Sequence, residues 1–289
     1  MLYLTDGGGP VKECGSKKSR GWKPRGFTLV ELLVVIAVIA LLATILVPSL
    51  ANIREQGRRT KCQTNVANLG KNLQSYIGEE MTYPKIPDAA IGTWNVAIGT
   101  ARNDDPFAAT PTAGRNPSTC LYLLVKAKYA KAAAMTCPSS GEKGRATASD
   151  VWDFEDASQL SYTFMNPFGG SINYWVAADP NAPVFADDSP YANANGSLDV
   201  SKTPTDWSAA NLSEAQIAQG NSPNHEGSGQ VVGSSDGSAH WEKRADCGVD
   251  RDNIYSHANA SATPPEETAQ QGSVSASGPA GPMDSYLVP

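Results

Sequence analysis

The sequence has 289 residues and a formal net charge of −6, and the charge is unevenly distributed along it. Residues 1–25 carry six basic and two acidic side chains, a net of +4, so the remaining chain carries −10. An acidic chain argues against a domain that binds nucleic acid or anionic lipid, because both functions normally need a basic face. The sequence also lacks P-loop, H-E-x-x-H and dinucleotide-binding motifs, so we predict that the protein is not an enzyme.

The first predicted element is an uncharged run of 22 residues from Leu32 to Ile53. A helix needs about 20 residues to cross the hydrocarbon core of a bilayer, so this run can span one. Basic residues between positions 17 and 25 precede it and, by the positive-inside rule, place this side in the cytoplasm. Basic residues from Arg54 to Lys61 weaken that orientation. No small-residue cleavage site follows the run, and we expect it to remain in the mature protein.

Gly26 and the letters FTLVE at 27–31 stand between the basic leader and the apolar run. Together these features resemble the N-terminal signal of the type IV pilin and type II secretion pseudopilin superfamily. The resemblance implies that a prepilin peptidase removes a leader of residues 1–26 by cutting after Gly26 and methylates the new amine of Phe27. It also implies three kinds of partner in assembly: copies of the chain, other pilin-like subunits and an inner-membrane assembly platform.

Glu31 would be the fifth residue of such a mature chain. A bare carboxylate inside a bilayer costs about 2.5–3.5 kcal/mol on insertion scales, so it normally has a partner. The resemblance implies that Glu31 of an incoming subunit pairs with the Phe27 amine of its neighbour, which relieves the burial cost of both charges. The alternative is a plain signal anchor whose glutamate reaches the membrane interface.

One long helix is predicted from about Thr28 to Glu80. We assign residues 27–53 to its membrane or filament-core half and residues 54–81 to an amphipathic half. Pro48 predicts a kink, because a proline inside a helix removes a backbone hydrogen bond. Many members of the superfamily that the N-terminus resembles also have a proline there. The alternative is a kink that is only tolerated in a membrane helix.

The amphipathic half is indicated by apolar residues at steps of four, three, four and three, the spacing of one helical face. These residues are Cys62, Val66, Leu69, Leu73 and Tyr76. The opposite face is predicted to carry the polar residues Arg58, Lys61, Asn65, Asn68, Lys71 and Asn72.

Residues 82–255 predict one loop-rich extracytoplasmic α+β domain. Ser118 and Thr119 are candidates to cap a short helix over residues 120–134. Three apolar runs predict strands, at 160–165, 172–178 and 183–186. The predicted fold class is therefore α+β, a long N-terminal helix packed on a small antiparallel β-sheet with extensive loops.

A hairpin is predicted where two β-rich runs flank Asp236-Gly237. Ten residues separate His225 from this pair, an arrangement that resembles the closing segment of a group of uncharacterised prepilin-like proteins. His225, Asp236 and His240 could hold a transition metal if the hairpin brought them together. The alternative is turn chemistry, with Asp236-Gly237 forming the corner and His225 bonded to nearby loop backbone.

The number of cysteines outside the predicted leader agrees with a domain that is exported from the cytoplasm. Cys14 lies in the predicted leader, which leaves Cys62, Cys120, Cys137 and Cys247. Four cysteines allow three connectivities, and an oxidising compartment makes disulfides plausible. The favoured pair is Cys120 with Cys137, because they bracket a compact segment. The alternative is four buried or unpaired thiols, and without a C-x-x-C pair a zinc ribbon or thioredoxin-type site is not expected.

Three aspartates near the C-terminus, Asp246, Asp250 and Asp252, are candidate calcium ligands. Major type II secretion pseudopilins, which the N-terminus resembles, bind calcium in a loop near their C-terminus. The spacing matches no EF-hand loop, and an ordinary acidic surface loop is the alternative.

Residues 256–289 are mostly small or polar, and we predict a disordered tail because little apolar surface is available to bury. The sequence as a whole predicts a non-enzymatic subunit of a type II secretion pseudopilus or type IV pilus-like filament. Such a chain starts as a single-pass inner-membrane protein with its C-terminal domain outside the cytoplasm, and ends in a periplasmic or extracellular filament. The alternative is a membrane-anchored extracytoplasmic binding domain that does not polymerise.

Overall fold

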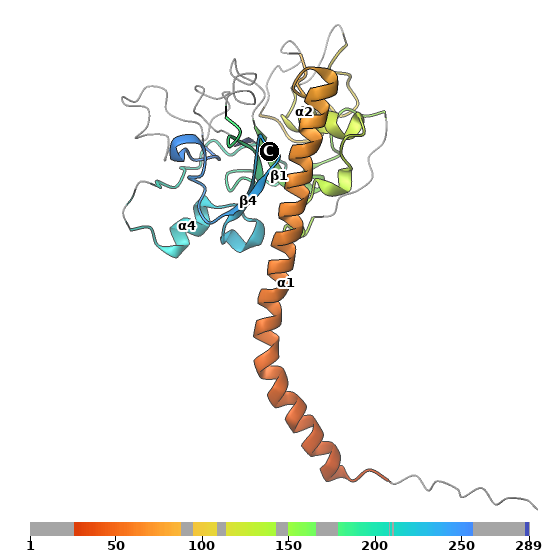
Figure 1. Ribbon diagram of the computed structural model, residues 1–289, viewed down its shortest axis with the longest axis vertical. Helices are drawn as coiled ribbons and strands as arrows, with labels where there is room; N and C mark the ends of the chain where they lie inside the picture. Colours follow the sequence, from red (N-terminus) through yellow and green to blue (C-terminus); the bar gives the residue numbers. More distant parts are fainter. Residues whose placement is uncertain are drawn as a thin grey trace, which may run out of the picture. The chain divides into compact units, whose positions relative to one another are not determined.

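The computed structural model describes residues 26–87, 95–108, 114–142, 150–165, 179–207, 209, 211–256 and 287–288. The chain divides into two compact units, residues 1–50 and residues 51–289. The first unit contributes the beginning of a long helix. The second contains the rest of that helix together with a small sheet and its connecting loops (Figure 1).

The long predicted helix is confirmed as α1 (Leu29–Glu80), which has 52 residues. Met81 follows it with a φ of 54°, in the left-handed region in which many helices end. Helical backbone includes position 48. The kink expected at Pro48 stays a prediction.

Five short strands form one antiparallel sheet in the order β4-β3-β2-β1-β5 (Figure 1). Their bounds are β1 (Tyr162–Met165), β2 (Pro183–Asp187), β3 (Gln230–Ser234), β4 (Ala239–Glu242) and β5 (Leu287–Val288). Two of the three predicted strands are confirmed as β1 and β2, and the run at 172–178 lies outside the described residues. The predicted hairpin is confirmed as β3–β4, and Gly237 in its turn has a φ of 82°, which favours glycine.

The C-terminal end of the chain corrects the expectation of a disordered tail over residues 256–289. Leu287 and Val288 form β5 and pair with Met165 and Phe164 of β1. Both side chains are fully buried, so their apolar burial offsets the cost of ordering this end of the chain. Residues 257–286 lie outside the described part of the chain.

The second half of α1 packs on the sheet through the face that its helical spacing predicts. Cys62, Val66 and Leu69 are fully buried. A Cβ atom added to Gly70 would lie only 2.9 Å from Cα of Gly237, so helix and hairpin meet backbone to backbone. This close approach fixes the position of α1 on β3 and β4.

Polar groups of α1 also join the sheet. The side-chain amides of Gln63 and Gln74 donate to the carbonyl oxygens of Ala239 and Ser235, both at 2.6 Å. Asn65, which was expected on the solvent face, is buried instead. The reason is that its side-chain amide donates to a buried backbone carbonyl oxygen across the helix interface.

Short helical elements complete the described part of the domain. They are α2 (Ser118–Lys126), η2 (Ala132–Ala134), η3 (Ala157–Gln159), α4 (Glu214–Gly220), η4 (Asn224–Gly227) and η5 (Val249–Arg251). The helix predicted over 120–134 is thus divided between α2 and η2. Pro117, rather than Ser118 or Thr119, occupies the position before α2, and the hydroxyl of Ser118 donates instead to the Asp153 carboxylate at 2.8 Å.

Candidate functional site

The N-terminal end of α1 is closed by reciprocal hydrogen bonds between Thr28 and Glu31. The backbone N–H and hydroxyl of Thr28 donate to Oε2 of Glu31 at 2.9 and 2.8 Å. The N–H of Glu31 donates in return to the Thr28 hydroxyl at 3.2 Å. This capping box satisfies donors that the first helical turn leaves free, and it holds the carboxylate where the helix dipole favours negative charge.

The predicted cleavage point lies just before this cap. Gly26 and Phe27 have non-helical backbone, and a Cβ atom on Gly26 would have no neighbour within 4 Å. The bond between them is therefore not locked into the helical hydrogen-bond ladder. The described geometry keeps this bond accessible.

The first half of α1 exposes its apolar side chains. Phe27 is 76% exposed and Ile53 is 61% exposed. The helix contains a segment long and apolar enough to cross a membrane by length and composition, and none of that segment is buried. A core helix of a globular domain has its apolar residues covered, so this segment needs a bilayer or other helices around it.

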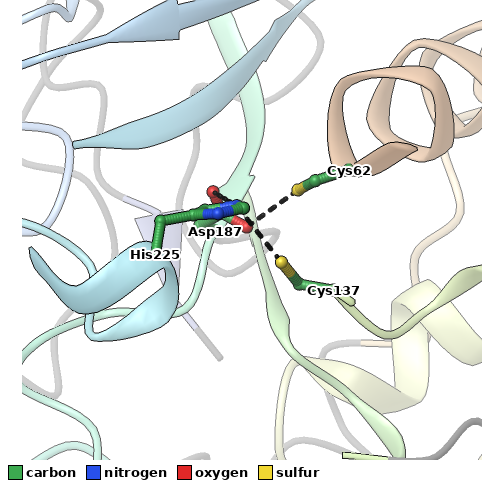
Figure 2. A group of neighbouring side chains, drawn as sticks. All are labelled: Cys62, Cys137, Asp187 and His225. Carbon is green, nitrogen blue, oxygen red and sulfur yellow. Dashed lines mark hydrogen bonds and ion pairs between the residues drawn. The ribbon is translucent and has the colours of Figure 1, made fainter. Parts of the chain in front are cut away.

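A second group of reactive side chains is buried in the larger unit, where Cys62, Cys137, Asp187 and His225 meet (Figure 2). They come from α1, the segment after η2, the last residue of β2, and η4. One possible ligand atom of each residue lies within 4.8 Å of the corresponding atoms of the other three. Figure 2 shows the four side chains pointing toward one another from these separate elements.

Within the cluster, the sulfur atom of each cysteine contacts a polar side-chain atom, of Asp187 for Cys62 and of His225 for Cys137. The thiol of Cys62 donates to Oδ1 of Asp187 with a separation of 3.1 Å. Sγ of Cys137 lies 3.3 Å from Nε2 of His225, and that nitrogen lies 3.6 Å from Oδ2 of Asp187. The backbone N–H of Val231 donates to Oδ2 of Asp187 at 2.7 Å, which fixes the carboxylate at the end of its strand.

Local backbone geometry directs His225 into the cluster. His225 and Glu226 have φ values of 57° and 59°, in the left-handed region that few non-glycine residues adopt. The side-chain amide of Asn224 donates to Oδ1 of Asp187 at 3.2 Å and holds η4 against β2. Nδ1 of His225 lies 2.5 Å from Oε1 of Glu55 on α1. Strained backbone of this kind is often found at functional sites.

The ionisable groups of the cluster shift one another's pKa values. Burial would lower the pKa of His225, but the Cys137 thiol and the Asp187 carboxylate outweigh it and raise the pKa to about 9. Burial, together with the charge of Cys137, raises the pKa of Asp187 to about 7. The hydrogen bond from Cys62 lowers the pKa of Cys137, while burial raises that of Cys62. The cluster therefore favours one thiolate beside a protonated imidazole.

The metal set suggested by the hairpin, His225 with Asp236 and His240, is not brought together. Asp236 accepts from the N–H of Ser238 at 2.8 Å and closes its own turn. His240 is exposed on β4, with Nε2 3.1 Å from the Ser238 hydroxyl oxygen. The alternative of a His225 ring bonded to loop backbone is also wrong, because both ring nitrogens face side chains.

The favoured disulfide between Cys120 and Cys137 is not present in the described part of the chain. Cys137 lies beside Cys62 instead, because the segment after η2 reaches back to α1. Cys120 is buried in α2, and Cys247 is partly exposed. The alternative of buried thiols agrees with the burial of Cys62, Cys120 and Cys137.

The three predicted calcium ligands receive no support from the described contacts. The carboxylate of Asp246 accepts from Nε and Nη2 of Arg244 at 2.8 and 2.9 Å, and from Nη2 of Arg251 at 2.9 Å. Two guanidinium groups thus neutralise it. Asp252 is buried after η5. Calcium binding through Asp246, Asp250 and Asp252 stays a prediction.

Sequence analysis missed Asp187 and Glu55. Glu55 lies seven positions before Cys62, and two helical turns place both residues on one face. The carboxylate of Glu55 on the same helical face as Cys62 was the signal in the sequence that could have identified it. Asp187 gave no comparable signal, because its role depends on where β2 ends beside η4.

Comparison with known proteins gives a family model and several relatives. A family model described as the prokaryotic N-terminal methylation motif matches residues 23–47. The chain is 34% identical over 73 residues to type II secretion system core protein G of Pectobacterium carotovorum, a match that covers 25% of this chain and 47% of that protein. The corresponding protein of Escherichia coli K12 is 37% identical over 62 residues, which cover 22% of this chain and 43% of the relative.

A type IV pilin also matches. The type IV major pilin protein PilA of Myxococcus xanthus is 34% identical over 59 residues, covering 20% of this chain and 27% of that pilin. The chain thus spans less than half the length of each of these relatives. No solved structure matches the chain. The methylation motif and these relatives support placing the chain in the pilin and pseudopilin superfamily.

Proposed function

We propose that this protein is a subunit of a type II secretion pseudopilus or type IV pilus-like filament. A prepilin peptidase cuts after Gly26 and methylates the amine of Phe27. The mature chain is held in the inner membrane by the first half of α1, with residues 82–255 outside the cytoplasm. An inner-membrane assembly platform then brings it together with copies of itself and other pilin-like subunits.

The observation that carries this proposal is the exposed apolar half of α1 beginning at a capped glutamate. Within the described part of the chain, the large apolar side chains of this half are exposed, from Phe27 at 76% to Ile53 at 61%. Bilayer lipid can cover them before assembly, and the same half of neighbouring subunits can cover them afterwards. The superfamily is one of structural subunits rather than of enzymes, which agrees with a non-enzymatic role.

Glu31 gives a second reason to propose assembly, because its carboxylate can pair with a charged amine. Its carboxylate is bonded at the start of α1, one turn from the place where cleavage would create an amine. That amine is a cation in the same apolar layer, so a carboxylate and an amine from adjacent subunits can neutralise each other. Removing one partner would leave a charge without compensation in the filament core.

Shearing cells and sedimenting the released material tests this proposal. We expect wild-type protein in the sedimented fraction and its loss when Glu31→Ala is introduced. Glu80→Ala is the matched control, because Glu80 is an exposed glutamate at the other end of the same helix. Processed wild-type protein that stays in the membrane as a monomer would contradict the proposal and favour a membrane-anchored binding domain.

A further inference from the structure

The buried cluster of Cys62, Cys137, Asp187 and His225 presents the donor set of a metal centre. Thiolate, imidazole and carboxylate are the groups that hold Zn²⁺ in four-coordinate protein sites, and the two sulfur donors disfavour Mg²⁺ and Ca²⁺. We propose that these four residues bind one Zn²⁺ ion, which joins α1, β2, η4 and the segment after η2. Neither the prepilin signal nor filament assembly requires this site, so the inference is independent of the proposed function.

The spacing of the donors fits a tetrahedral shell. Zinc–ligand bonds of 2.0–2.3 Å place neighbouring ligand atoms about 3.3–3.8 Å apart. The separations are 3.1 Å for Cys62 Sγ to Asp187 Oδ1, 3.3 Å for Cys137 Sγ to His225 Nε2, and 3.6 Å for His225 Nε2 to Asp187 Oδ2. All four ligand atoms lie within 4.8 Å of one another, so side-chain adjustments that bring the wider pairs closer, with one oxygen of Asp187 as the ligand, would surround one ion.

Outer hydrogen bonds already hold the donors in place. Nδ1 of His225 faces Oε1 of Glu55, which leaves Nε2 directed at the cluster. A carboxylate on the far nitrogen is the usual support of a metal-bound imidazole. The N–H of Ser139 donates to Sγ of Cys137 at 3.4 Å, and the Ser139 hydroxyl donates to Glu55. Such an arrangement orients ligands before the ion arrives.

Charge balance also favours a cation. The cluster places two thiols and a carboxylate at positions with no solvent exposure, where uncompensated negative charge is costly. One Zn²⁺ ion with two thiolates, a carboxylate and a neutral imidazole carries a net charge of −1. Binding releases whatever protons the two thiols, the imidazole and the Asp187 carboxyl carry, with no change in oxidation state.

Burial argues that this zinc is structural. Cys137, His225 and Glu55 could also be read as a nucleophile, a base and an orienting acid. Yet Cys137 is fully buried, and two cavities in the described part of the domain are lined by other residues. All four zinc positions are taken by protein, which is typical of structural rather than catalytic sites.

The test uses the full-length chain purified in detergent without chelator. Elemental analysis is expected to find about one zinc per chain, as a single closed site requires. Replacement by Co²⁺ should give the visible absorption of a tetrahedral ion together with thiolate-to-cobalt charge transfer. This second measurement uses the wild-type chain and so does not depend on whether any variant folds.

Matched substitutions locate the ion. His225→Asn removes the imidazole but tolerates the left-handed backbone, and Cys137→Ala removes one thiol. Both should abolish the cobalt spectrum, whereas His240→Asn and Cys120→Ala should keep it. Glu55→Ala should weaken zinc affinity by about 10–100-fold, because Glu55 positions the imidazole without binding the ion.

Two outcomes would overturn the inference. One is wild-type chain that carries no zinc and, after reduction, takes up neither Zn²⁺ nor Co²⁺. The other is a zinc content and cobalt spectrum that His225→Asn and Cys137→Ala leave unchanged.

Discussion

Glu31 acts both as a helix cap and as a charge, and one substitution separates these roles. Gln serves at the third position of a capping box as well as Glu does, so Glu31→Gln keeps the bonds to Thr28 and removes the negative charge. We expect Glu31→Gln to be lost from the sheared fraction to the same extent as Glu31→Ala. A glutamine variant that assembles like wild type would instead assign the role to capping.

Single residues also explain why the two halves of α1 behave differently. Ile53 and the apolar residues before it are exposed, whereas Cys62, Val66 and Leu69 are fully buried. The apolar side chains of α1 are thus exposed in its first half and covered by the domain in its second half. A substitution before residue 50 should change assembly with little effect on domain stability, while one after residue 60 should do the reverse.

The contact between α1 and the β3–β4 hairpin depends on Gly70. Gly→Ala in an exposed helix normally stabilises by about 0.5–1 kcal/mol. At Gly70 the new Cβ would lie 2.9 Å from the Gly237 backbone, so we expect Gly70→Ala to lower the free energy of unfolding by about 1–3 kcal/mol. Gly78→Ala, with open space around the added Cβ, is the matched control and should be neutral or stabilising. Urea unfolding measures both, and equal effects would contradict the packing described.

The contact between α2 and the neighbouring loop depends on a buried carboxyl. Asp153 accepts from the Ser118 hydroxyl at 2.8 Å and from the N–H of Gly99 at 3.1 Å, and burial raises the pKa of Asp153 to about 6. The folded protein therefore holds this proton more tightly than the unfolded chain does. Stability contributed by the protonated form is lost as the pH rises from about 4 to about 6, by up to about 1.4 kcal/mol per pH unit.

Urea unfolding at several pH values between about 4 and 6 tests this linkage. Asp153→Asn should flatten the pH dependence relative to wild type, although it also lowers stability by breaking the bond to Gly99. Asp199→Asn is the control, because Asp199 is only partly buried and hydrogen bonds from Ser201 lower its pKa. An unchanged slope in Asp153→Asn would show that this carboxyl does not titrate in that range.

Local sequence patterns predicted the helix and the hairpin, whereas the buried cluster depends on contacts between residues far apart in the sequence. The apolar run and the spacing from Cys62 to Leu73 placed α1 to within one residue at its start, and Asp236-Gly237 placed the hairpin. Glu55 and His225, by contrast, are 170 positions apart. Their contact depends on how η4 docks beside β2, which no short sequence window reports. For the same reason Asp187 was missed, and Cys137 was expected beside Cys120 rather than beside Cys62.

The last described residues of the larger unit complete its sheet. β5 adds the last described residues to β1, so the C-terminus contributes to the core although the chain before it is rich in small residues. We expect Val288→Ala to lower the free energy of unfolding by about 1.5–3 kcal/mol through lost apolar burial. Val200→Ala, at a valine that is 55% exposed, should change it by less than about 0.5 kcal/mol. Equal effects in a urea titration would show that β5 is not part of the folded domain.

The proposed subunit combines an N-terminus that is expected to be processed, an exposed apolar helix half and a folded domain with its own core. Each part suits a subunit that leaves the membrane and enters a polymer. The domain remains folded while the surroundings of the helix change, because its core is formed after residue 60.

The intact mass of the protein recovered from the sheared, sedimented fraction tests this account most directly. The account predicts a chain that begins at Phe27 and carries one additional methyl group, and it predicts that Gly26→Leu keeps the 26-residue leader and is absent from that fraction. Wild-type protein that still begins at Met1, or that never sediments, would contradict it.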